Sequence, residues 1–201
     1  MIKIKDENVW VTSDWHFFHD KDFCYAARGY SSVEQMTAML INKFNSVVKP
    51  DDTVFCLGDC VMGSIDEEKI VSTLEKLNGH IYIILGNHDS DKKVEIYKKC
   101  KNITVLGYGE MIQWDKKNIF YLSHYPTLTA NYDDEQPFKP TVINLCGHCH
   151  TKNKFDDLDK GLIYHVEVDA HNGYPVSLET IVNDLFKMKI ALADKMVFEK
   201  S

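Results

Sequence analysis

The chain has 201 residues, of which 44% are hydrophobic and 11% aromatic, so it has enough apolar surface to form a folded core. Its 30 acidic residues outnumber its 23 lysines and arginines, and the net charge of −7 argues against duplex nucleic acid as a partner. A small phosphorylated substrate stays compatible with this charge if metal ions supply positive charge. No apolar run approaches the ~18 residues of a membrane span, and residues 1–7 contain no stretch of signal-peptide type. We therefore expect a cytoplasmic protein that does not associate with membranes.

The predicted elements alternate between strands and helices at first and are mostly strands later. A strand over 9–13 precedes a helix that starts with the capping pattern of Ser32 and ends near 48. A strand over 53–57, a helix over 64–79, a strand over 81–85 and a short helix over 92–99 follow. Strands over 103–114, 119–123, 142–146 and 163–168 precede a last helix, which Ser177 caps. This order predicts a mixed α/β fold with more than one sheet, and we expect residues 1–201 to form a single domain.

The loops and cysteines add two expectations. The polar segments 129–141 and 152–161 are expected to be surface loops beside a site. The chain has six cysteines, an even number that would permit disulfides, but Cys56 and Cys146 lie inside apolar strand-like runs. Without an export signal, we expect the thiols to be reduced. The spacing of Cys146 and Cys149 is that of a CxxC motif, yet no second such pair supports a zinc ribbon.

Five of the strand-like runs end at side chains that bind metal ions. In chain order these ends are Asp14-Trp15-His16, Asp59, Asn87-His88-Asp89, His124 and His148-Cys149-His150. A single Asp-x-His or Gly-Asp has little value as a signal, but five such ends in one short chain predict a polynuclear metal site, since ligands gather at the carboxyl ends of strands. Carboxylate, imidazole and amide oxygen together suit divalent Mn, Fe, Zn, Co or Ni.

Local spacing favours the same site. Residues i and i+2 of an extended segment share a face, so Asp14 should point with His16, and His148 with His150. A glycine directly precedes Asp59, Asn87 and His148, which allows a tight backbone turn at each strand end.

In their order and composition, these motifs resemble those of the calcineurin-like metallophosphoesterase superfamily over residues from about 9 to 150. The stretch from Val168 resembles the end of its small, single-domain bacterial and phage branch. The resemblance implies a four-layer αββα fold, in which two stacked mixed β-sheets are flanked by helices and the site lies along one edge. The sequence reads Asn87-His88-Asp89 where the protein phosphatase branch has Asn-His-Glu, and the Asp-Arg-Gly that this branch carries after its Gly-Asp is absent after Gly58-Asp59. These departures argue against a Ser/Thr protein phosphatase.

Carried over residue by residue, the resemblance implies two divalent ions, with Mn as the first expectation. One ion would be held by Asp14, His16 and His150, the other by Asn87, His124 and His148, and Asp59 would bridge both. His88 resembles the family's substrate-side histidine, which we expect to be a general acid, and Asp89 resembles the carboxylate that orients it.

Two further residues are candidates for substrate binding. His19 lies three residues after His16 and could contact a substrate phosphate or support the metal ligands instead. Arg28 is the nearest cation to the first motif, so it could bind a substrate anion or have an ordinary role on the surface.

These features predict a binuclear metal-dependent phosphoesterase that hydrolyses a small phosphodiester or nucleotide with a hydroxide bridging the two ions. A phosphomonoesterase or a nuclease could use the same site. A scaffold of this fold that binds without turnover is the alternative from a different functional class, and the complete set of ligands argues against it.

Overall fold

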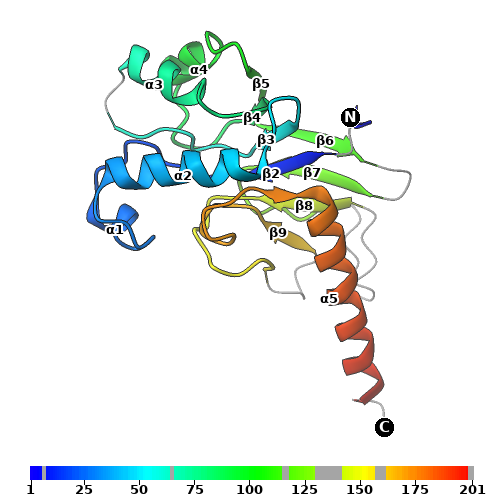
Figure 1. Ribbon diagram of the computed structural model, residues 1–201. Helices are drawn as coiled ribbons and strands as arrows, with labels where there is room; N and C mark the ends of the chain where they lie inside the picture. Colours follow the sequence, from blue (N-terminus) through cyan, green and yellow to red (C-terminus); the bar gives the residue numbers. More distant parts are fainter. Residues whose placement is uncertain (6–7, 64–65, 115–117, 130–141, 157–161, 199–201) are drawn as a thin grey trace.

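The computed structural model describes residues 1–5, 8–63, 66–114, 118–129, 142–156 and 162–198. Two five-stranded sheets dominate it (Figure 1). The first sheet has the order β10 (Val176–Ser177), β2 (Val9–Thr12), β3 (Thr53–Cys56), β4 (His80–Ile84) and β5 (Ile103–Gly107). The second has the order β1 (Ile2–Lys3), β6 (Gly109–Gln113), β7 (Ile119–Ser123), β8 (Val142–Cys146) and β9 (Ile163–His165).

Both sheets are mixed. Strands β2 to β5 are parallel, and only β10 runs antiparallel to its neighbour in the first sheet. In the second sheet, β6 and β7 pair antiparallel, whereas β1 with β6, β7 with β8 and β8 with β9 pair parallel. The expected strand over 103–114 is two strands in different sheets, because the chain turns at Gly107, whose φ of 114° suits glycine.

The helices are α1 (Asp22–Tyr25), α2 (Val33–Val47), α3 (Glu67–Leu74), α4 (Asp91–Tyr97) and α5 (Leu178–Phe198). Ser32 caps α2 as expected, since its side chain accepts a hydrogen bond from the Gln35 amide. Asp66 caps α3, while the expected start at Ser64 lies outside the described residues. Ser177 Oγ accepts from the Thr180 amide at 3.1 Å at the start of α5.

Two apolar clusters hold the layers together. One joins α2, α3 and α4 to the outer face of the first sheet and includes Met36, Phe44 and Ile81. The other lies between the sheets and includes Phe55 of the first sheet, Phe120 of the second and residues of the first turns of α5. The architecture of two stacked mixed sheets with flanking helices is thereby confirmed. Most of segment 129–141 and part of 152–161 lie outside the described residues.

Two other observations concern the expectations about the cysteine thiols and about membrane spans. All six cysteines are free thiols, and only Cys149 is exposed. Among the described helices, none is both long and apolar enough to cross a membrane.

Candidate metal centre

The predicted ligands come from strand ends of both sheets. Asp14 and His16 follow β2, Asp59 follows β3, Asn87 follows β4, His124 follows β7, and His148 and His150 follow β8. The structure brings all seven together through the contacts described below. Asp14, His16, Asp59 and His124 are buried at the bottom of the site, whereas Asn87, His148 and His150 are exposed at its rim.

The backbone at five of these seven ligands is left-handed rather than extended. The φ angles are 58° at Asp14, 49° at His16, 55° at Asp59, 73° at His148 and 49° at His150. The side chains of Asp14 and His16 do converge, but the expected extended geometry is wrong for both pairs. Left-handed residues other than glycine are uncommon and cluster at functional sites, where the surrounding structure holds them.

The first group of ligands is centred on one oxygen of Asp14. Asp14 Oδ1 lies 3.6 Å from His16 Nε2 and 3.8 Å from His150 Nε2. Asp14 Oδ1 and both ring nitrogens of His16 are buried without a hydrogen-bond partner among the described residues. Buried polar atoms without partners are costly, so this geometry fits a cation that all three side chains share.

The second group is centred on Asp59 and Asn87. Asp59 Oδ2 lies 3.5 Å from His16 Nε2 and also 3.5 Å from His124 Nε2, so it stands between the two groups. Asn87 Oδ1 lies 2.9 Å from His124 Nε2 and 3.0 Å from His148 Nδ1. Asp14, Asp59 and His124 could also share an ion, since their ligand atoms lie within 4.8 Å of one another.

Hydrogen bonds fix one oxygen of each carboxylate and leave the other for the site. Asp14 Oδ2 accepts from Ser13 Oγ at 2.6 Å and from the His148 amide at 2.9 Å. Asp59 Oδ1 accepts from the His88 amide at 2.9 Å. Burial would raise the pKa of the Asp14 carboxyl, but the nearby His16 ring and the hydrogen bond from Ser13 hold the pKa below its usual value. Asp14 is therefore ionised at neutral pH, as a metal ligand must be.

Two histidines have an orienting partner on the ring nitrogen that faces away from the site. His124 Nδ1 lies 2.8 Å from the Leu57 carbonyl oxygen, and His150 Nδ1 lies 2.8 Å from Asp169 Oδ2. These oxygens accept a hydrogen bond from Nδ1–H, so Nε2 of each ring keeps its lone pair for an ion. The hydrogen bond to Asp169 raises the pKa of His150 above its usual value.

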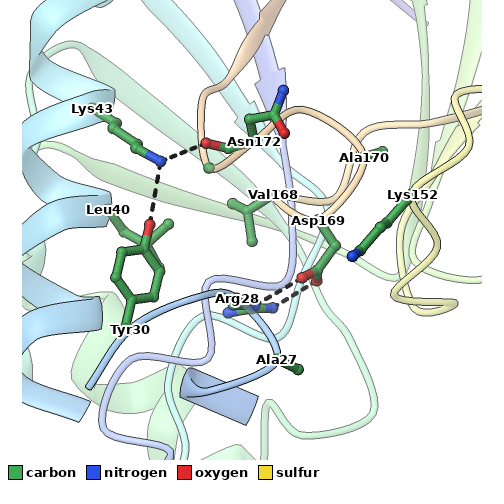
Figure 2. Close-up of a pocket in the computed structure, with 11 residues that line it drawn as sticks. Ala27, Arg28, Tyr30, Leu40, Lys43, Lys152, Val168, Asp169, Ala170 and Asn172 are labelled. Atoms are coloured by element: carbon green, nitrogen blue, oxygen red, sulfur yellow. Dashed lines mark hydrogen bonds and ion pairs between the residues drawn. The ribbon is translucent and has the colours of Figure 1, made fainter. Parts of the chain in front are cut away.

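Asp169 is in turn held by Arg28, as Figure 2 shows. Arg28 Nε donates to Asp169 Oδ1 at 2.9 Å, and a terminal nitrogen donates to Oδ2 at 2.8 Å. The same guanidinium donates to the backbone oxygens of Trp15 and Asp14. The Arg28 side chain is 7% exposed, so an ordinary surface role is excluded; its donors tie the first ligand loop to the loop that carries Asp169.

The sequence contains little that would have assigned this role to Asp169. It lies outside the five strand ends, and no spacing rule connects it with His150 or Arg28. Lys93 was also missed: its buried ammonium group donates to the Val61 oxygen at 2.7 Å and to the His88 oxygen at 2.8 Å, and it holds the backbone beside the site.

His88 and Asp89 occupy different environments. The His88 side chain is 43% exposed, and its Nε2 lies 3.9 Å from Asp59 Oδ2. Asp89 is buried and accepts from the amides of Asp59 and Gly86 and from the Tyr97 hydroxyl. Among the described residues, Asp89 does not hydrogen-bond the His88 ring. Its contacts hold the loop of Asp59 in place instead.

His19 borders the same group of rings. Its ring stacks on His16 with centroids 5.5 Å apart, and its Nδ1 is buried without a partner among the described residues. Burial and the neighbouring His16 lower the pKa of His19 below its usual value. A neutral ring beside the ligands is compatible with either role considered for His19.

The comparisons with known proteins agree with this geometry. The family model of the calcineurin-like phosphoesterases matches residues 7–192, so the chain belongs to this family. An uncharacterized protein of Methanocaldococcus jannaschii is 33% identical over 188 residues, which cover 90% of this chain and 93% of that protein. The gene 66 protein of Mycobacterium phage L5 is 37% identical over 83 residues, 41% of this chain and 40% of that protein.

A solved structure supports the fold. A protein of unknown function from Aquifex aeolicus superimposes with a TM-score of 0.66 at 23% identity, covering 88% of this chain and 98% of that one. The family binds divalent metals, and the ligand groups of this chain fit that chemistry.

Proposed function

We propose that the protein is a binuclear metal-dependent phosphoesterase that hydrolyses a small phosphodiester or nucleotide. The position of Asp59 is the observation that carries the proposal. Its Oδ2 lies 3.5 Å from a histidine of each ligand group, as expected for a carboxylate shared by two ions. Family membership supports phosphoester hydrolysis, and the mixture of oxygen and nitrogen ligands favours Mn²⁺, with Fe, Zn, Co or Ni as alternatives.

The contacts among the ligands suggest how they divide between the two ions. Asp14, His16 and His150 would hold one ion, and Asn87, His124 and His148 the other. Two bound divalent ions would neutralise phosphate oxygens and lower the pKa of a water molecule that attacks phosphorus. The buried carboxylates set the positions of the ions, because their other oxygens are fixed by the backbone of neighbouring loops.

His88 is suited to protonate the leaving group. Its amide is held by Asp59, and its exposed ring reaches the edge of the ligand cluster. A proton on His88 Nε2 can pass to the oxygen of the departing alcohol, which would otherwise leave as a basic alkoxide. The hydrolysis needs no covalent enzyme intermediate.

The decisive experiment measures bound metal and hydrolysis together. The Mn²⁺-loaded protein should bind two ions per chain and hydrolyse bis-(p-nitrophenyl) phosphate. Asp59→Asn should lose activity and bind fewer ions. Asp184→Asn is the matched control, since Asp184 bonds Lys154 and Tyr164 outside the site. One ion per chain at saturation, or full activity in Asp59→Asn, would refute the binuclear assignment.

Assays of the same Mn²⁺-loaded protein distinguish the alternative functions. A monoesterase would prefer p-nitrophenyl phosphate to the diester, and a nuclease would cleave short RNA or DNA faster than either. Two bound ions with no hydrolysis of any of these substrates would favour the scaffold.

A further inference from the structure

A cavity of about 320 Å³ is shown in Figure 2, and one of its lining residues, Asp169, contacts the ligand His150. Its lining includes α2 residues on one side and the loop over 168–173 on the other. The Arg28–Asp169 ion pair forms part of this lining, and Asp169 also contacts His150 at 2.8 Å. The cavity and the ligand cluster are thus separated by one pair of side chains. A molecule held over the cluster could extend into the cavity.

The cavity has a surplus of positive charge in an acidic protein. Four charged side chains line it, namely Arg28, Lys43, Lys152 and Asp169. The two hydrogen bonds between Arg28 and Asp169 balance one positive charge with one negative charge. The ammonium groups of both lysines then have no carboxylate to balance them within the lining.

The two lysines present these charges differently. Lys43 Nζ donates to the Asn172 oxygen at 2.7 Å and to the Tyr30 hydroxyl at 3.3 Å. Both acceptors are neutral, and the described residues include no ion-pair partner of Lys43, so these contacts fix the position of the ammonium group without cancelling its charge. Lys152 is exposed, and in the part of the chain that the structure describes, its side chain has no hydrogen bond or ion pair. Figure 2 shows Lys43 on the α2 side of the cavity and Lys152 beside Asp169.

We propose that this cavity binds a second phosphate group of the substrate, remote from the bond that is hydrolysed. This inference rests on the proposed function, and it names the substrate class: a nucleotide phosphoester that carries another phosphate. A phosphate in the cavity can accept a charge-assisted hydrogen bond from the exposed Lys152 ammonium group, and the charge of Lys43 adds to the attraction. The volume exceeds that of a phosphate alone and is in the range of small-molecule sites, which leaves room for part of an attached sugar.

The kinetic test uses two substrates with the same scissile bond. They are the p-nitrophenyl ester of thymidine 5′-phosphate and its counterpart with a 3′-phosphate. We expect a kcat/KM roughly five- to tenfold higher for the 3′-phosphorylated ester, the size of one partly exposed charge-assisted contact. Lys152→Met should remove most of this ratio, and Lys101→Met, a matched exposed lysine outside the cavity, should keep it.

A binding test separates this inference from the proposed function. The chelator-treated protein should bind thymidine 3′-phosphate but not thymidine in calorimetry, and Lys152→Met should weaken this binding about fivefold. Such binding without hydrolysis of either ester would support the phosphate site and refute the proposed function. Equal kcat/KM for the two esters, with nucleotide binding that Lys152→Met leaves unchanged, would refute the phosphate site and leave the proposed function intact.

Discussion

Replacing Asp169 by asparagine tests how the His150 ligand is oriented. The Asp169 carboxylate accepts one hydrogen bond from His150 and two from Arg28. Asparagine keeps the size of the side chain but has one acceptor oxygen and no charge. Asp169→Asn therefore cannot keep all three contacts, and an uncharged amide oxygen holds the His150 Nδ1 proton more weakly than the carboxylate does.

Loss of such a supporting partner typically reduces metal affinity ~10–100-fold, or about 1.4–2.7 kcal/mol. We expect this loss for the ion at Asp14, His16 and His150 alone. Chelator-treated protein titrated with Mn²⁺ by calorimetry should show one weakened site and one unchanged site. Asp184→Asn is again the control. A folded Asp169→Asn protein that binds both ions as tightly as wild type would refute the orienting role.

The same variant also affects folding. Arg28 loses its counter-charge in a nearly buried position, and breaking such a pair costs about 3–5 kcal/mol. Burial opposes ionisation of Asp169, but its contacts with His150 and Arg28 hold its pKa well below the usual value. This contribution is complete above the unfolded pKa of about 3.9 and is lost as the pH falls toward the lower folded pKa. Urea titrations should show the difference between wild type and Asp169→Asn shrinking below about pH 4.

Three other outcomes are expected. His88→Ala should keep both ions yet lose ~10²–10⁴-fold more rate on an alkyl ester than on a nitrophenyl ester, because nitrophenolate leaves without a proton; equal losses in a leaving-group series would exclude a proton donor. Gly147→Ala should lower Mn²⁺ affinity in the same titration, because a methyl group there would overlap Asp14 Oδ2; unchanged affinity would show that the loop adjusts freely. A reductant should leave activity and melting temperature unchanged, because Cys56 and Cys60 are free thiols with sulfurs 3.6 Å apart; a drop in either quantity would reveal a disulfide.

The strand ends could be predicted from sequence because apolar runs and the residues that terminate them are local patterns. The segment around Gly107 shows the limit of such local patterns. Two glycines, Gly107 and Gly109, interrupt the segment 103–114, but only three-dimensional packing places its halves in different sheets.

The orienting partners could not be predicted for a related reason. Asp169 and His150 are 19 residues apart, and Arg28 is 141 residues from Asp169, so no local pattern links them. Asp89 shows that two residues adjacent in the sequence need not have side chains in contact. It is adjacent to His88 in sequence, yet its carboxylate points to the amides of Asp59 and Gly86. Adjacency in the sequence thus suggests a contact, here between Asp89 and His88, that a turn of the backbone can prevent.

The division of the ligands between the two sheets has a mechanical consequence. Asp14, Asp59 and Asn87 follow strands of the first sheet, and His124 and His150 follow strands of the second. An ion shared by Asp14 and His150, or by Asn87 and His124, would fasten the layers at their edge. A ligand bound only by the native state stabilises it by about 2.7 kcal/mol at a hundredfold excess over its Kd. The layers of the loaded protein should then separate only in global unfolding, whereas the chelated protein should open first at this edge.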